Sequence, residues 1–407
     1  MIEQFSRAVV RWRYVVVLLS FVLVALATMG VKNLSMDTDY RVFFGPDNPQ
    51  LQAFDKLQDT YTKTDNILFM FAPKDGDVFD VNTMTAVYEM TEAAWQLPYT
   101  SRIDSLSNYQ NTVADEDELI VEDLILNPAD LDAERLQYIK QVSLNEPQLK
   151  QRLISPEGHV TAVNATLRIP TDNMAAVPEA VAAARALRDE YEAKYPELEI
   201  KLTGIVMMNN AFTEASMQDT STLTPAMFLV VLLILSILLR DGSKRQYFAA
   251  LGSIIALVAI AFEISNPVVS GLVGLTCVLI VMFFMTPTFS SLLVIIMSIA
   301  TAMGLAGWMG AVITPPVASA PTIILTMAVA DAVHLLVTMR QNMQQGMAKH
   351  DAIVESIRVN FMPILITSVT TAIGFLTMNF SEAPPFHTLG NVVATGVTAA
   401  FVFSVTF

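Results

Sequence analysis

The chain has 407 residues, of which 53% are hydrophobic and 15% charged, against roughly 25% charged residues in an ordinary soluble domain; this excludes a wholly soluble protein. The formal net charge of −15 excludes nucleic acid as the main partner, because a phosphate backbone requires a basic surface. The single cysteine, Cys277, excludes a disulfide framework.

About eight apolar runs are long enough to cross ~30 Å of hydrocarbon as helices. We therefore expect an α-helical polytopic membrane protein, interrupted by one long polar segment. The predicted spans are 13–31, 223–239, 247–263, 267–285, 289–311, 320–339, 361–379 and 389–407.

Residues 1–31 contain a short basic N-terminus and the first span. Arg7, Arg11 and Arg13 precede an apolar run, an arrangement that a cleaved signal peptide also has. The run is too long for a signal-peptide core and further spans follow it. We therefore predict a retained transmembrane helix with a cytoplasmic N-terminus.

Residues 32–222 form the acidic, extramembrane part. Short predicted strands and helices alternate along it, as in a small α+β domain. A strand over 66–72, a helix over 81–97 and a strand over 102–109 form one β-α-β unit. A second unit follows, with a strand over 160–169, a helix over 175–195 and a strand over 199–206. The two units predict a pair of ferredoxin-like subdomains. We expect the acidic segment 115–150 to be helical and to connect them, its charges forming a solvated face and no metal site.

Residues 223–407 form a membrane bundle whose orientation follows from its basic residues. If eight spans alternate from a cytoplasmic N-terminus, every Lys and Arg outside 32–222 lies on the cytoplasmic side. These residues are Arg7, Arg11, Arg13, Arg240, Lys244, Arg245, Arg340, Lys349 and Arg358. The domain 32–222 is then periplasmic, and the protein is a multi-pass component of a bacterial inner membrane.

The loop 340–360 has apolar residues at helical spacing, including Met343, Met347, Ile353 and Ile357. This pattern predicts a cytoplasmic amphipathic helix at the membrane interface, with a soluble linker helix as the alternative. The last apolar run reaches Phe407 without a polar or basic anchor, from which we expect that the polypeptide is truncated at its C-terminus.

Asp331 is the residue that most requires an explanation, because it lies inside the sixth span. A carboxylate there costs about 2.5–3.5 kcal/mol on insertion scales and is rare without a partner or a water-filled path. His334 follows one helical turn later, so the pair predicts a proton relay working near neutral pH. The alternative is that Asp331 only hydrogen-bonds a neighbouring helix.

Hydroxyl side chains cluster in the seventh span: Thr367, Ser368, Thr370, Thr371 and Thr377. Thr367, Thr370 and Thr371 are candidates for a hydroxyl wire that carries water to the carboxyl group. The alternative is that these small residues only allow helices to pack closely. No phosphate loop, zinc-ligand spacing or nucleophile motif is present, so we expect no enzymatic activity, no cofactor and no metal site.

These residues resemble the resistance-nodulation-division (RND) superfamily, most closely its MMPL-like exporters of hydrophobic and amphiphilic compounds. The resemblance covers nearly the whole chain. The matching stretches are 38–44 (TDYRVFF), 304–310 (GLAGWMG), 320–324 (APTII) running into 330–334 (ADAVH), and 363–375 (PILITSVTTAIGF).

Two features depart from the family pattern. About 45 extra residues, roughly 240–286, read as an added helical hairpin, and Met327 stands where many members have a glycine four residues before the aspartate. The family is built from two such halves, so the resemblance implies that this chain is the N-terminal one. A second half, fused or in another chain, then provides a partner for Asp331, and we expect an oligomer.

The resemblance implies export of a hydrophobic or lipid-like substrate, driven by the proton-motive force, with membrane lipids as further partners. One alternative is a non-pumping lipid sensor or scaffold, because sterol-sensing membrane regions share this arrangement of spans. Another is an accessory of protein export, which requires a peptide-binding groove in the domain 32–222.

Overall fold

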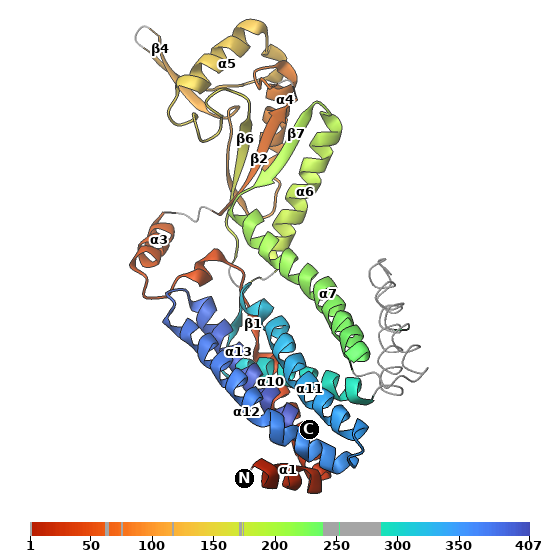
Figure 1. The fold of residues 1–407 in the computed structure, drawn as a ribbon. Helices are drawn as coiled ribbons and strands as arrows, with labels where there is room; N and C mark the ends of the chain where they lie inside the picture. The colour runs from red at the N-terminus through yellow and green to blue at the C-terminus, as the bar shows by residue number, and fades with distance from the viewer. Residues whose placement is uncertain are drawn as a thin grey trace. The chain divides into compact units, whose positions relative to one another are not determined.

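The structure, a computed structural model, describes residues 2–61, 65–74, 76–115, 118–170, 173, 175–238, 252 and 286–407. The chain separates into two compact units (Figure 1). One, here called the α+β unit, is Pro46–Thr213; the other, here called the helical unit, combines Met1–Gly45 with Glu214–Phe407. The α+β unit is thus somewhat shorter at both ends than the domain 32–222 expected from the sequence.

The α+β unit contains both predicted β-α-β units, and its helices begin at side-chain caps. Asn48, Asp80 and Asp132 accept hydrogen bonds from backbone N–H groups of the first turns of α3, α4 and α5, which fixes where these helices start. The elements in chain order are α3 (Pro49–Thr60), β2 (Asp65–Pro73), α4 (Val81–Ala94), β3 (Thr100–Asp104), β4 (Gln110–Asp115), β5 (Glu118–Asp123), α5 (Ala133–Asn145), β6 (Thr161–Leu167), α6 (Ala176–Lys194) and β7 (Leu198–Thr203).

The two β-α-β units share one sheet and do not form a pair of subdomains, which corrects the prediction. The strand order is β3-β6-β2-β7, and β2 is antiparallel to both β6 and β7 (Figure 1). In each unit the two strands are separated by one strand position. The strand of the other unit fills that position, which completes the ladder in a single ferredoxin-like arrangement.

The segment 115–150 is also different from the prediction of one helix. β4 and β5 form a two-stranded hairpin, with Gln110 opposite Asp123 and Asp115 opposite Glu118, and only α5 is helical. The hairpin pairs with no other strand of the described residues. Leu119 and Val121 on it are exposed, so the segment lacks the buried, alternating face that would have identified strands in the sequence.

The core of the α+β unit lies between the four-stranded sheet and its helices. Ile67, Phe69 and Phe71 alternate along β2 and are fully buried against Met84, Met90 and other residues of α4. At the edge of this core, Glu89 accepts hydrogen bonds from Lys194 Nζ and the Tyr195 hydroxyl, and thereby ties α4 to the end of α6.

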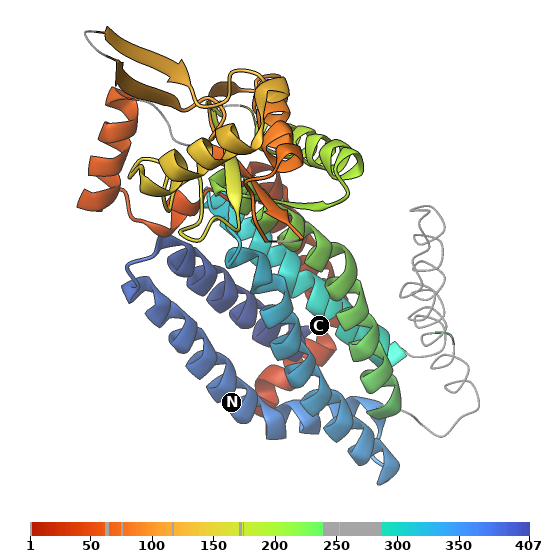
Figure 2. The ribbon, with the colours of Figure 1, turned by 90° about the horizontal axis from the view of Figure 1, so that it is seen from above.

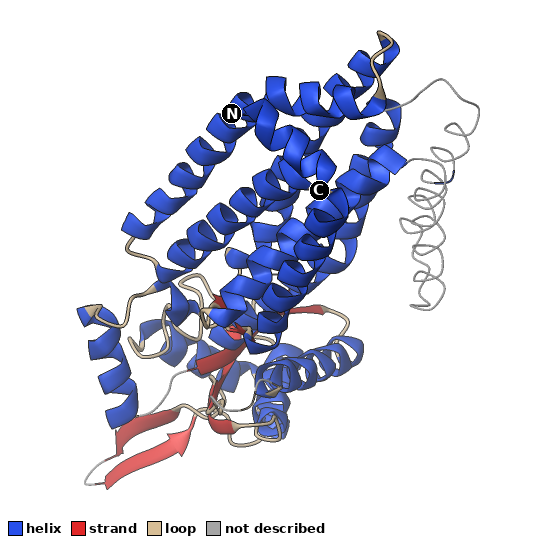
Figure 3. Ribbon diagram, turned by 90° about the horizontal axis from the view of Figure 1, so that it is seen from below, coloured by secondary structure: helices blue, strands red, loops and turns tan. Residues whose placement is uncertain are grey.

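The helical unit is formed almost entirely by long helices, as Figure 3 shows. Among the residues that the structure describes, five stretches are long and apolar enough to cross a membrane: Arg13–Asn33, Pro287–Trp308, Val317–Gln344, Lys349–Phe380 and Pro384–Thr406. The helices are α1 (Ile2–Arg11), α2 (Arg13–Thr28), α7 (Ile205–Leu238, which begins in the α+β unit), α10 (Thr286–Trp308), α11 (Ala320–Gln344), α12 (Lys349–Leu376) and α13 (Pro384–Thr406).

The five stretches correspond to the predicted spans 13–31, 289–311, 320–339, 361–379 and 389–407. The span 223–239 falls on the end of α7, and the spans 247–263 and 267–285 lie outside the described residues. The chain is therefore a polytopic membrane protein. Leu18, Phe21 and Leu26 of α2 are among many apolar side chains that are exposed on the protein, a surface that is stable in lipid and not in water.

The segment 340–360 is not a separate amphipathic helix. α11 continues to Gln344, residues 345–348 form a turn, and α12 then runs from Lys349 as one helix. The helices α11 and α12 continue past their most apolar parts. Their adjoining ends have the mixed apolar and polar pattern that suggested an interfacial helix. At the N-terminus, the ring of Phe5 on α1 packs edge-on against Phe361 of α12.

Glycines allow α2 and α10 to approach closely. A Cβ atom at Gly304 would overlap the backbone of Ala27, and one at Gly307 would overlap the carbonyl oxygen of Gly30. Trp308 Nε1 donates to the Leu26 carbonyl oxygen at 3.2 Å in the same contact. Beyond it, β1 (Ser35–Met36) pairs in parallel with β8 (Val312–Ile313). These contacts attach the first span to α10.

Candidate functional site

Asp331 lies in the middle of the buried face of α11. The buried residues of this helix follow one another at helical spacing: Ala320, Ile324, Leu325, Ala328, Asp331, Ala332 and Leu335. Asp331 is only 2% exposed. The helix packs on α10, α12 and α13, which run beside it (Figures 1 and 2). The carboxyl group is therefore enclosed by neighbouring spans, as an ionisable residue within a membrane requires.

Two apolar clusters border Asp331 along the bundle. One contains Leu325 and Ala328 together with Ile295 of α10 and Ala400 of α13. The other contains Leu335 together with Ile357 and Ile364 of α12 and Val405 of α13. A carboxylate between such layers is poorly solvated, and its charged form is costly unless a partner or water stabilises it.

Ser368 of α12 is the side chain that contacts the carboxyl group. It is 4% exposed, and its hydroxyl donates to Asp331 Oδ2 at 3.5 Å, a long and therefore weak hydrogen bond. This contact joins α11 to α12, as expected if Asp331 holds two helices together. The same contact leaves most of the hydrogen-bonding capacity of the carboxyl group unused among the described residues, because Oδ1 has no hydrogen bond there.

The structure does not bring His334 to the carboxyl group. Asp331, Ala332 and Leu335 belong to the buried face, whereas His334 is exposed. His334 lies one helical turn after Asp331, as predicted. The side of α11 that packs against other helices includes Ala328, Asp331 and Leu335 and does not include His334. No hydrogen bond or ion pair joins His334 to another described residue.

Two of the three predicted threonines, Thr367 and Thr370, are exposed and bond to their own helix. Thr367 is exposed and donates to the Ile364 carbonyl oxygen at 2.9 Å, and Thr370 donates to the Ile366 carbonyl oxygen at 2.8 Å. Thr371 lies one turn after Ser368 and is half-buried. The hydroxyls of Thr367 and Thr370 thus bond to the backbone of their own helix, and neither hydroxyl has a hydrogen bond to the carboxyl group of Asp331.

Ser368 is the site residue that sequence reasoning placed in the cluster but did not select. It follows Ile357 and Ile364 on the buried face of α12 at intervals of seven and four residues. That spacing was the available signal. It is hard to recognise in a membrane helix because the side facing lipid is as apolar as the packed side.

The chemistry of the arrangement is that of a buried acid with one hydroxyl neighbour. A carboxyl group can gain or lose a proton and thereby change between a neutral and a charged state within the bundle. Among the described residues, no group of three or more His, Cys, Asp or Glu side chains is arranged to hold a metal ion. The site offers a change of charge.

Comparison with known proteins assigns both parts of the chain. The model of the MMPL family matches residues 43–274. A second model, described as Patched SSD, matches residues 253–407, the part that contains Asp331 and Ser368. No curated protein sequence matches the chain. These families are associated with transport of lipids and other hydrophobic compounds or with sterol-sensing membrane functions.

Proposed function

The chain belongs to the MMPL family of RND-type transporters, and from this premise we propose that it exports hydrophobic or lipid-like compounds, driven by the proton-motive force. The substrate is extracted from the inner membrane of a bacterium or carried across it. The observation that carries the proposal is the enclosure of Asp331 among α10–α13. An acid at such a position is costly, and proton transfer is a function that accounts for it.

In this mechanism Asp331 alternates between a protonated and a charged form. The neutral form is compatible with its apolar neighbours, and the charged form favours a packing that admits water or a cationic partner. The membrane potential supplies ~2.3 kcal/mol per charge per 100 mV, which is enough to shift a two-state equilibrium severalfold to tens of fold. α11 and α12 are the elements that respond, since the Asp331–Ser368 contact lies between them.

We further propose the topology of eight spans, with the N-terminus in the cytoplasm and the α+β unit in the periplasm. The distribution of basic residues supports it. Arg7 and Arg11 precede the first span and Arg13 begins it. Arg340 lies near the end of α11 and Lys349 begins α12, so both flank the turn that the positive-inside rule assigns to the same side as the N-terminus. A second membrane block, from the same or another chain, is proposed to provide the partner for Asp331.

The test is proton-coupled transport in vesicles with an imposed pH gradient. Asp331→Asn should abolish uptake of a hydrophobic fluorescent substrate into inverted vesicles and leave membrane insertion unchanged. Asp351→Asn is the matched control, because it makes the same chemical change at an exposed residue in the first turn of α12. This variant should transport the substrate as the wild type does. Wild-type transport by the Asp331→Asn variant would contradict the proposal.

A second candidate function has support from the Patched SSD match over 253–407: a sterol-sensing-like membrane protein that binds lipid without pumping. It predicts sterol binding that does not depend on Asp331 and no substrate movement when the pH gradient is imposed. Measuring sterol binding for the wild type and Asp331→Asn, beside the transport assay, distinguishes the two functions.

A further inference from the structure

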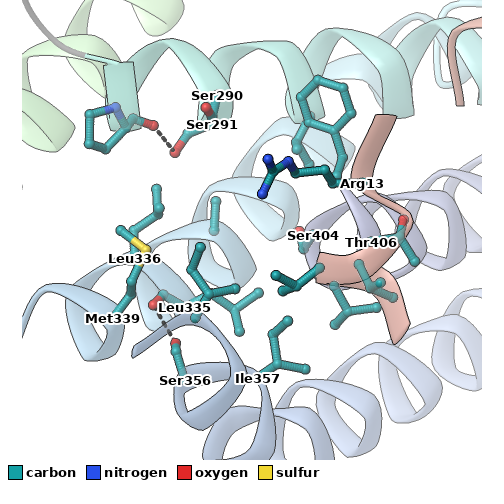
Figure 4. A pocket seen from close by; sticks show the side chains of 18 of the residues that line it. Arg13, Ser290, Ser291, Leu335, Leu336, Met339, Ser356, Ile357, Ser404 and Thr406 are labelled. Atoms are coloured by element: carbon teal, nitrogen blue, oxygen red, sulfur yellow. Dashed lines mark hydrogen bonds between the residues drawn. The ribbon is translucent and has the colours of Figure 1, made fainter. Parts of the chain in front are cut away.

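A cavity of about 620 Å³ lies at one end of the helical unit, a volume within the range of about 300–1,000 Å³ that is usual for ligand-binding pockets. Figure 4 shows Leu335, Leu336, Met339 and Ile357 along its apolar wall. Asp331 does not line it, so it is distinct from the candidate site above.

Cationic side chains line the same cavity. Arg13 is the first residue of α2, and Lys349 and His350 begin α12. Arg13 Nη1 donates to His350 Nε2 at 2.8 Å. An arginine only donates, so this imidazole nitrogen accepts and the histidine neutralises no charge. The Arg13 side chain enters the cavity from α2 (Figure 4).

The two permanent cations of the cavity have no acidic partner in the described part of the chain. Other basic residues nearby do: Arg7 pairs with Glu3 at 3.0 Å, and Arg358 pairs with Glu355 at 2.6 Å. No such ion pair involves Arg13 or Lys349. The first-turn N–H groups of α12 add partial positive charge beside Lys349, because no side chain caps this helix.

A further polar atom of the cavity is unused. Ser404 Oγ of α13 is buried and has no hydrogen-bond partner among the described residues, although Ser404 lines the cavity. Ser290 and Ser291 of α10 also line the cavity, and the Ser291 hydroxyl donates to the Pro287 carbonyl oxygen at 3.1 Å (Figure 4). A ligand that fits therefore has an anionic group, hydrogen-bonding oxygens beside it and an apolar remainder.

We propose that this cavity binds an anionic phospholipid of the cytoplasmic leaflet. Its phosphate lies between Arg13 and Lys349, and the start of its acyl chains lies against Leu335, Leu336 and Ile357. Basic pockets between spans on the cytoplasmic side are suited to such head groups. The leaflet follows from the orientation proposed above; the chemistry of the ligand does not depend on the direction or the energy source of transport.

The test measures binding of fluorescent phosphatidylglycerol to the purified full chain in detergent, without a gradient. Arg13→Gln and Lys349→Gln should each weaken binding about fivefold, and the double variant about 25-fold, since each basic residue near an anionic lipid contributes about one such step. Arg358→Gln is the matched control, because Arg358 already has a carboxylate partner and does not line the cavity.

Phosphatidylethanolamine with the same chains should bind far more weakly to the wild type, because it carries no net charge. Equal affinity of the two lipids would overturn the proposal, and so would wild-type binding of phosphatidylglycerol by the double variant. Displacement of the lipid by millimolar inorganic phosphate would assign the site to a free anion and also overturn it. Asp331→Asn should bind phosphatidylglycerol as the wild type does. The binding result can therefore be interpreted even if the transport proposal fails.

Discussion

Ser368 is, in the described part of the chain, the side chain that hydrogen-bonds Asp331. A neighbour of this kind orients the carboxyl group and stabilises its charged form, and hydrogen bonds to charged groups contribute about 1.5–3 kcal/mol. The long distance places this contact at the low end of that range. The contact between Asp331 and Ser368 joins α11 to α12.

Ser368→Ala should slow proton-coupled transport about tenfold, because the carboxyl group loses its only donor among the described residues. Initial rates in vesicles with an imposed pH gradient measure this effect. Ser368→Thr keeps the hydroxyl and should retain most activity. Thr370→Val is the control on the same helix, since Thr370 bonds to its own backbone. An equal loss in Thr370→Val would assign the effect to helix packing.

Glu89 in the α+β unit predicts a pH dependence of stability. Partial burial is the largest influence on the pKa of this carboxyl and raises it, but the Lys194 and Tyr195 hydrogen bonds and the lysine charge outweigh burial, so the pKa lies below its ordinary value of 4.5. A group with a lowered folded pKa stabilises the protein above its unfolded pKa. That contribution is lost as the pH falls through the folded pKa.

Glu89→Gln should therefore lower the Tm of the full chain by a few degrees at most at pH 6, and the difference from the wild type should shrink as the pH falls below 4.5 and through the lowered folded pKa. The effect is small because solvent screens the partly exposed pair. Thermal unfolding at a series of pH values measures it. Glu92→Gln, an exposed position on the same helix, should behave as the wild type. A difference that does not shrink as the pH falls would refute the ionic explanation.

At the scale of elements, the glycine contact between α10 and the first span, Arg13–Asn33, predicts a stability effect. Gly307→Ala should lower the Tm of the detergent-solubilised chain by several degrees, because the added methyl overlaps the Gly30 carbonyl oxygen and overpacking costs about 1–3 kcal/mol. Gly374→Ala is the control: nothing lies within 4 Å of a Cβ at this position of α12. That variant should be neutral or slightly stabilising, because alanine favours a helix.

Helices and strands could be predicted from the sequence where one face is buried and the opposite face is exposed to solvent. Along β2 the buried Ile67, Phe69 and Phe71 alternate with less buried residues, and the predicted strand over 66–72 differs from β2 by one residue at each end. The hairpin β4–β5 was missed because its acidic, exposed strands have no such alternation. Its cross-strand hydrogen bonds are a property of pairing, which a single segment does not reveal.

The candidate site was predictable in part. A carboxylate in an apolar run is visible at once, and Asp331 is buried as expected. Its neighbours were not predictable, because lipid-facing and protein-facing sides of a span are equally apolar and the rotation of α11 about its axis decides which residues meet. Thus His334, one turn away, is exposed, whereas Ser368, 37 residues away in the chain, is the contact.

At the scale of the whole molecule, the proposed orientation can be tested with single cysteines in a Cys277→Ser background. Glu157→Cys lies on an exposed turn of the α+β unit and Gln345→Cys on the exposed turn between α11 and α12. A membrane-impermeant maleimide added to intact cells should label the first and should label the second only after permeabilisation. The opposite pattern would invert the proposed topology.

The interleaved sheet also determines how the α+β unit can be divided. Because β6 lies between β2 and β3, and β2 lies between β6 and β7, neither β-α-β segment contains the neighbours that its own strands need. A cut between Asn145 and Thr161 would leave two fragments. In each fragment the two strands would lack the strand between them, which only the other fragment provides. Such fragments should remain unfolded alone and recover their structure together, which makes this position suitable for a split reporter of assembly in living cells.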